Sequence, residues 1–216
     1  MAGHQMANTS SGTKAKHSTM HWAQYPVTFD EYNHRVFEVV GLEDCRLRKD
    51  GYLDIIVNAY NLIAKLQNNG GIDLLLFCMR AGKVDIALLQ ANYRLFYELV
   101  CKKKVPIVLV VTGLEREEEM ESWWTRNGQI LQRHGIYVDG HACITAFNGT
   151  HREHEGLYEE SRHLVRELVK QHAHGSHGGR YMEDKELYSI FVRIVKGLLW
   201  GNLPPKRDIM TVLSKR

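Results

Sequence analysis

VPIVLVVT, residues 105–112, is the stretch of this chain that decides its fold. It is uncharged and rich in β-branched residues, which is typical of a strand that is covered on both faces. IDLLLFCM at 72–79 is apolar in the same way, and HACITAF at 141–147 is a further β-rich run. We predict that all of these runs are strands, and that 72–79 and 105–112 are buried on both sides.

Helical spacing of apolar residues predicts a helix over residues 52–66 and another around Tyr93. LEREEEMESWWTRNGQILQRHG (114–135) is predicted to form the next helix, because its acidic start and basic end suit the helix dipole. Thr150–Glu153 is a capping-box pattern that opens a last helix through Gln171. Strands that alternate with helices imply βαβ crossovers, so the predicted architecture is a three-layer, doubly wound α/β fold with a mostly parallel sheet.

The two ends of the chain differ from this central pattern. YPVTF at 25–29 and RVFEVV at 35–40 are β-rich and are predicted to form a hairpin around the turn-like DEYN between them. HAHGSHGGR breaks the composition near residue 172, and LYSIFVRIVKGLLW at 187–200 has a wide apolar face. We therefore expect one domain over 1–172, a His/Gly-rich linker at 173–186, and an amphipathic helix with a basic tail at 187–216.

Composition limits the class of protein. A chain of 216 residues, of which 44% are hydrophobic, can bury one core, and its net charge of +3 gives no reason to expect nucleic acid. Neither a secretory signal nor an apolar run of about 18–20 residues is present. Cys78, Cys101 and Cys143 lie in apolar runs, which is typical of free, buried thiols in a reducing compartment. The expected location is the cytoplasm.

In open α/β sheets, ligands bind beyond the carboxyl ends of the strands. Three predicted strand ends carry residues suited to such a site: Glu38 with Gly41, Thr112 with Glu115, and Thr145 with Ala146. Taken singly, each has an ordinary structural interpretation as a turn glycine, a helix-start carboxylate or a strand threonine. Their order along the chain is more informative than any one of them.

Several long stretches resemble a group of fungal proteins that contain a P-loop GTPase domain, also called a G domain. They are IDLLLFCMRAGKV, NYRLFYELVCKKKVPIVLVVTGLEREEEMESWWTRNG and GHACITA, with HSTMHW and VVGLED before them. The resemblance covers most of residues 1–172, and it is specific because Trp123-Trp124 and LEREEEME are unusual strings. It implies a Ras-like fold that binds GTP or GDP with Mg²⁺.

On the phosphate side, the resemblance makes Thr19 the switch threonine that closes on Mg²⁺ and the γ-phosphate. Glu38 and Gly41 stand at the ends of the DxxG pattern. Glutamate in place of aspartate adds one methylene, which moves a metal-bound water by about an ångström. A misplacement of that size costs on the order of 100-fold in a positioned reaction.

On the base side, Thr112 and Glu115 stand where the family carries N/T-K-x-D, whose carboxylate reads the N1 and N2 hydrogens of guanine. Thr145 and Ala146 correspond to the base-contacting loop, which is usually Ser-Ala. Gly113 takes the place of the lysine that packs on the base, so that stacking contact is expected to be lost.

The largest departure from the family is the phosphate cradle. A P-loop needs G-x-x-x-x-G-K-[ST], and no lysine in this sequence is followed by serine or threonine. The family segment that matches Met1–His4 lies at the end of the helix after the P-loop, so we expect the first strand and the P-loop to precede residue 1. Losing about four charge-assisted hydrogen bonds, each contributing roughly 1.5–3 kcal/mol, predicts very poor GTP binding and negligible hydrolysis.

The missing strand is central in the Ras-like order, where it separates the strands at 35–40 and 73–79. Either those two strands pair directly or they keep open edges, which favours a homo-oligomer or a protein partner. Residues 187–200 are a second candidate for protein docking, and contact with a membrane surface is the less favoured alternative. The leading hypothesis is a degenerate or truncated GTP-binding G domain, and the alternative is a non-catalytic protein-interaction module.

Overall fold

The computed structural model describes residues 22–39, 59, 61–62, 65–66, 69–82, 85–148 and 154–173. They fall into two compact units, one ending at Asn69 and one beginning at Gly70. The predicted linker beyond Ala173, the helix at 187–200 and the tail to residue 216 lie outside the described residues.

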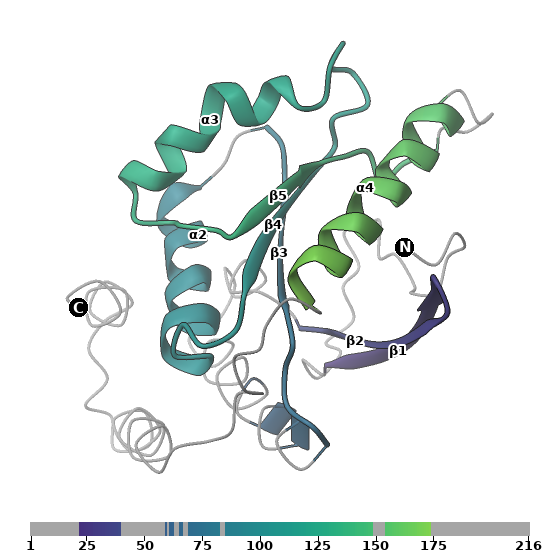
Figure 1. Cartoon of the computed structure of the whole chain (residues 1–216). Helices are drawn as coiled ribbons and strands as arrows, with labels where there is room; N and C mark the ends of the chain where they lie inside the picture. The colour runs from purple at the N-terminus through teal and green to yellow at the C-terminus, as the bar shows by residue number, and fades with distance from the viewer. Residues whose placement is uncertain are drawn as a thin grey trace, which may run out of the picture. The chain divides into compact units, whose positions relative to one another are not determined.

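The first unit contains the predicted hairpin. Strands β1 (Ala23–Phe29) and β2 (Tyr32–Glu38) pair antiparallel, with Phe29 opposite Tyr32 (Figure 1). Asp30 and Glu31 form the turn, with φ of 49° and 66°. A two-residue turn with both central φ values positive matches the right-handed twist of the strands, which makes the connection shorter than the expected DEYN turn.

The predicted helix at 52–66 is confirmed at the positions that the structure describes. Residues 59, 61, 62, 65 and 66 are helical, and the apolar ones, Ala59, Leu62 and Leu66, are buried. Lys65 places its ammonium group 4.1 Å from the ring centre of Trp22, at the start of the hairpin. Arg35 donates a 2.6 Å hydrogen bond to the carbonyl oxygen of Asn69. Within this unit, the hairpin therefore contacts the helical residue Lys65 and the turn residue Asn69.

The second unit is an α/β domain around a parallel sheet. Its strands β3 (Leu75–Arg80), β4 (Ile107–Thr112) and β5 (Gly140–Cys143) lie in the order β3-β4-β5. Both pairings are parallel, with Cys78 opposite Val110 and Val111 opposite Cys143. The predicted fold class, a parallel sheet connected through helices, is confirmed at this level.

Helices cover both faces of this sheet (Figure 1). α2 (Ile86–Tyr93) begins where the Asp85 carboxylate accepts a 3.1 Å hydrogen bond from the Leu88 amide, and it continues as a π-helix, η2 (Arg94–Val100). α2 and α3 (Ser122–Arg133) lie on one face, and α4 (Glu155–Ala173) lies on the other. The second unit therefore has three layers.

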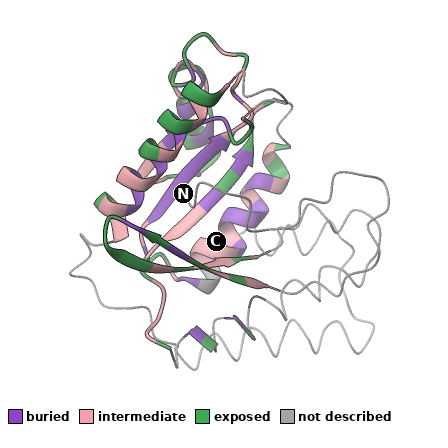
Figure 2. Ribbon diagram, turned by 90° about the vertical axis from the view of Figure 1, so that its right-hand side faces the viewer, coloured by how far each residue is buried: buried purple, intermediate pink, exposed green. Residues whose placement is uncertain are grey.

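The core forms around β4, whose residues are buried from Ile107 to Val111 (Figure 2). Its residues Ile107, Leu109 and Val111 belong to one apolar cluster together with side chains of α2 and α3. That cluster also contains Leu89, Tyr93, Trp123 and Leu131. The expectation that 105–112 is a strand buried on both faces is therefore confirmed.

The same expectation is wrong for the strand at 72–79. In β3, Phe77 and Met79 are buried, whereas Cys78, which points to the other face, is exposed. α4 packs mainly against β5 and less against β4. It therefore covers the β5 side of its face of the sheet better than the β3 side. Cys101 and Cys143 are buried free thiols as predicted, and the predicted burial of Cys78 is incorrect.

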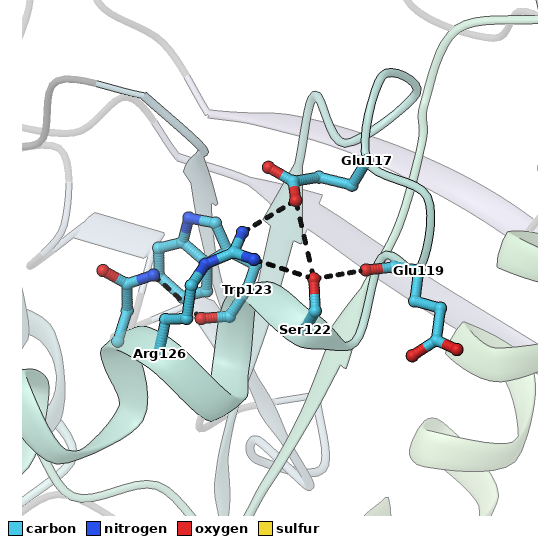
Figure 3. A network of polar contacts seen from close by, with 6 residues as sticks. Glu117, Glu119, Ser122, Trp123 and Arg126 are labelled. Carbon is cyan, nitrogen blue, oxygen red and sulfur yellow. Dashed lines mark hydrogen bonds and ion pairs between the residues drawn. The ribbon is translucent and has the colours of Figure 1, made fainter.

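The helix predicted to begin at Leu114 begins only at Ser122. Residues 114–121 form turns, because Leu114 and Met120 are both buried in the core and the chain between them cannot follow one helical path. The Glu117 carboxylate pairs with Arg126 at 2.7 Å instead of lying in the first turn of α3 (Figure 3). The acidic run is therefore a loop that is anchored at both ends.

The sequence predicted that the strands at 35–40 and 73–79 either pair directly with each other or keep open edges. β2 pairs with β1, and β3 pairs with β4, so β2 and β3 belong to different sheets. Direct pairing of the strands at 35–40 and 73–79 is therefore not found within the described residues. β3 stands at one end of the parallel sheet.

Truncation of the central strand should be costly. We expect Leu109→Ala to lower the free energy of unfolding by about 2–5 kcal/mol, because Leu109 is fully buried and a cavity would remain. Ile130→Ala, on an exposed position of α3, should change it by less than about 0.5 kcal/mol. Urea unfolding followed by tryptophan fluorescence measures both, and equal losses in the two variants would contradict this description of the core.

Candidate functional site

The carboxyl ends of the three parallel strands meet along one edge of the sheet, which we call the C-terminal edge. β3 ends at Arg80, β4 ends at Thr112 opposite it, and the chain leaves β5 toward Thr145. In parallel α/β sheets this is the edge beyond which ligands bind. The residues predicted at two of the three strand ends therefore belong to one region of the molecule.

Thr112 is engaged with the neighbouring strand. Its hydroxyl donates a 3.3 Å hydrogen bond to the carbonyl oxygen of Met79, and its own carbonyl oxygen accepts a 2.7 Å bond from the Ala81 amide. Thr112 thus extends the pairing of β3 and β4 to the end of both strands. Its role in the structure is to fix the edge, and its hydroxyl is already used.

Gly113 follows with a φ of 82°, a conformation that favours glycine. A Cβ atom at this position would lie 3.1 Å from Cγ and 3.2 Å from Nε of Arg80. The Arg80 side chain therefore crosses the space that a side chain at 113 would take. The positive φ favours glycine here, and a Cβ atom would also require the Arg80 side chain to shift by a few tenths of an ångström.

Glu115 and Thr145 come together from neighbouring loops. The Thr145 hydroxyl lies 3.4 Å from Oε2 of Glu115 and 3.0 Å from the carbonyl oxygen of Phe147. One hydroxyl proton serves only one of these acceptors at a time, and the Phe147 carbonyl is the closer. The same hydroxyl oxygen accepts a 3.1 Å bond from the Phe147 amide. Thr145 is 1% exposed, whereas Ala146 and Phe147 are exposed, with Phe147 at 52%.

Ser161 on α4 is a site residue that the sequence did not reveal. Its hydroxyl oxygen accepts a 3.0 Å hydrogen bond from the Thr145 amide, and its proton goes to the carbonyl oxygen of Leu157 at 2.6 Å. Ser161 is buried among apolar positions of α4, near Val165. A small polar residue on the apolar face of a helix was the available signal. Ser161 joins the Thr145 loop to the helical layer.

A second polar cluster fixes the start of α3 against β5. His141 Nε2 lies 2.6 Å from Oε1 of Glu121, and its ring stacks on Trp124 with 4.0 Å between ring centres. The neighbouring Cys143 thiol is buried, and burial, followed by the charge of Glu121, raises its pKa to about 12. Trp123 is buried in the core and Trp124 is stacked, so packing accounts for both tryptophans.

The remaining predicted residues are not part of the C-terminal edge as described. Glu38 is the exposed last residue of β2 in the first unit, and its Oε2 accepts a 3.2 Å hydrogen bond from the Tyr25 hydroxyl. Thr19 and Gly41 lie outside the described residues. The structure therefore brings together the predicted base-side residues and leaves the predicted phosphate-side residues untested.

The second unit thus belongs to the broad class of parallel α/β domains, and comparisons with known proteins do not narrow that class. No model of a known protein family matches the chain, and no curated protein is significantly similar to it. Among the described residues, no group of three or more His, Cys, Asp or Glu side chains is arranged to hold a metal ion. No helix in the described part of the chain is long and apolar enough to cross a membrane.

Removing the Thr145 hydroxyl should destabilise the second unit. In Thr145→Val the Phe147 amide loses its buried acceptor, so we expect the free energy of unfolding to fall by about 1–3 kcal/mol. Thr125→Val makes the same change at an exposed position of α3 and should cost less than about 0.5 kcal/mol. A Thr145→Val variant as stable in urea as its control would contradict the hydrogen bonding described above.

The free thiols should react at very different rates. Burial raises the pKa of Cys101 and of Cys143 to about 12, so on the order of 10⁻⁴ of each is thiolate at pH 8, and reagents also lack access. We expect Cys78, which is exposed, to be alkylated at least about a hundredfold faster in the native state. Raising the pH to 9 should increase every rate but keep this order. Peptide mass spectrometry assigns the sites, and equal native-state labelling of Cys143 and Cys78 would refute the prediction.

Proposed function

We propose that this chain is a guanine-nucleotide-binding protein of the P-loop GTPase kind, with a Ras-like G domain. In this proposal, Glu115 and Thr145 at the C-terminal edge of the sheet bind the guanine base. The observation that carries the proposal is the approach of Glu115 to Thr145, which are 30 residues apart in sequence and 3.4 Å apart in space. These are the residues that the resemblance assigns to guanine. The parallel order β3-β4-β5, with α4 on the opposite face from α2 and α3, supports the same proposal.

Glu115 has the chemistry that reading guanine requires. A carboxylate accepts hydrogen bonds only, and guanine offers two adjacent donors, the N1 and N2 hydrogens. Among the described residues, the one partner of the Glu115 carboxylate is Thr145, whose hydroxyl has a closer acceptor in Phe147. The Glu115 oxygens therefore retain acceptor capacity for a ligand. Adenine presents an unprotonated N1 on that edge, and the two lone pairs would repel.

The proposal includes weak binding of phosphate. Residues 1–216 contain no G-x-x-x-x-G-K-[ST], so a triphosphate lacks the usual lysine and its cradle of amides. Glu38, where catalysis would need a shorter carboxylate, is hydrogen-bonded to Tyr25. GTP or GDP with Mg²⁺ is the proposed ligand class, with little affinity and negligible hydrolysis by these residues themselves.

A non-catalytic interaction module remains the second candidate, and one observation favours it. β3 stands at one end of the parallel sheet, and its residue Cys78 is exposed on the face that α4 covers over β5. A partner that packs on this face, including a second copy of the chain, would complete the layer. The two functions use different parts of β3, its face and its carboxyl end, and can be tested separately.

Base selectivity tests the first proposal. We expect GMP to bind more tightly than IMP, which lacks the 2-amino group, and IMP more tightly than AMP, with amide NMR shifts at Thr145 and Phe147. Glu115→Gln should weaken GMP binding about 10- to 100-fold, because one acceptor of a charge-assisted pair is replaced by a donor. Glu118→Gln, an exposed change in the same loop, is the control. Equal affinity for GMP and AMP would overturn the proposal.

A further inference from the structure

Arg80 has an unusual position at the C-terminal edge. It is the last residue of β3, it lies opposite Thr112, and its side chain is exposed. Its stem and Nε lie against Gly113, within 3.1–3.2 Å of where a Cβ atom would stand. Gly113 is two residues before Glu115, so the stem and Nε of Arg80 lie beside the start of the loop that carries Glu115.

The guanidinium group of Arg80 has no polar partner among the residues that the structure describes. Within the described part of the chain it makes no hydrogen bond and no ion pair, although the acidic loop 114–121 begins next to Gly113. Arg126 is the arginine that pairs with Glu117 in that loop, at 2.7 Å. The stem of Arg80 therefore lies against Gly113, while its planar, charged guanidinium group has no partner among the described residues.

We propose that Arg80 is the stacking residue of this site, with its guanidinium plane lying on the face of a purine ring whose edge is read by Glu115. The inference rests on the proposed function and adds a base-stacking residue to it, one that contributes affinity for any purine. A guanidinium is planar and weakly hydrated, and it stacks on electron-rich aromatic faces, which an ammonium group does less well.

The close approach of Arg80 also gives Gly113 a role in the site. A Cβ atom at 113 would stand 3.1 Å from Cγ of Arg80, so the Arg80 stem would have to shift, and the residue would adopt a strained φ of 82°. In this proposal, Gly113 leaves room for the Arg80 stem, and the guanidinium group of Arg80 is the planar surface on which the base stacks. A ligand that is aromatic but has no donor edge would use the plane alone, whereas guanine uses both the plane and Glu115.

Titration of the full chain with GMP tests the inference, with NMR of the Arg80 side chain and of the Thr145 amide. In the wild type we expect upfield ring-current shifts at Arg80. Arg80→Ala should weaken GMP and AMP alike, by about two- to fivefold, since stacking does not depend on the edge of the base. Arg80→Lys should bind GMP nearly as weakly as Arg80→Ala, because lysine keeps the positive charge but has no planar group for stacking. Arg133→Ala, an exposed arginine at the end of α3, should have no effect.

Each other outcome has a defined meaning. If Arg80→Ala binds GMP as the wild type does while Glu115→Gln loses base selectivity, the inference falls and the proposed function stands. If Arg80→Lys restores full affinity, charge and not stacking is at work, and the inference is overturned. If the wild type binds no GMP, both fall together. Thermal unfolding of each variant confirms that the fold is intact.

Discussion

The hydrogen bonding of β4 on both of its edges is the constraint on which the second unit depends. At its start, the Ile107 amide donates to the Asp139 carboxylate and the Ile107 carbonyl accepts from the Asp139 amide, both at 2.8 Å. The pairing with β3 continues beyond both strand ends, from the Leu75 amide on Pro106 to the Ala81 amide on Thr112. Because β4 is buried on both faces, its apolar pattern does not set the register, and these hydrogen bonds at its two ends do.

The register of the strands fixes where their carboxyl ends meet, and core packing of the neighbouring loops then fixes the positions of the site residues. Leu114 and Met120 anchor the two ends of the loop in the core and so hold Glu115 near Thr145. Within the described ranges, Glu115 makes no ion pair. Ser161 holds the Thr145 amide from the opposite layer. In the function that we propose, these contacts would preorganise the acceptors that read the edge of a planar ligand.

The parts that the sequence predicted well are those in which one local pattern decides the structure. The β-branched run of β4 and the hairpin belong to this group. Predictions failed where two distant segments decide together. α3 starts late because Leu114 and Met120 both reach the core, and Cys78 is exposed because α4 extends over β5 more than over β3.

The candidate site was predicted in the same uneven way. Thr112, Glu115 and Thr145 were found because the carboxyl ends of parallel strands must meet at one edge. Ser161 and the proposed stacking residue Arg80 were not found from the sequence. A serine on the apolar face of α4 was a signal for Ser161, but its contact with Thr145 and the contact of Arg80 with Gly113 follow only from the fold. The π-helical turn of η2, in which the Cys101 amide bonds to the Phe96 carbonyl at 3.0 Å, has no signature in the apolar pattern either.

We propose that Glu115 and Thr145 bind a guanine base, and that residues 1–216 bind its phosphates only weakly. The ratio of the dissociation constants of GMP and Mg·GTP, measured on the same preparation with and without Mg²⁺, tests it most directly. We expect a ratio near one that does not change when Mg²⁺ is removed, because residues 1–216 contain no G-x-x-x-x-G-K-[ST] to hold the phosphates and the metal. Binding of Mg·GTP that is a thousandfold tighter than that of GMP, and is lost with Mg²⁺, would contradict it.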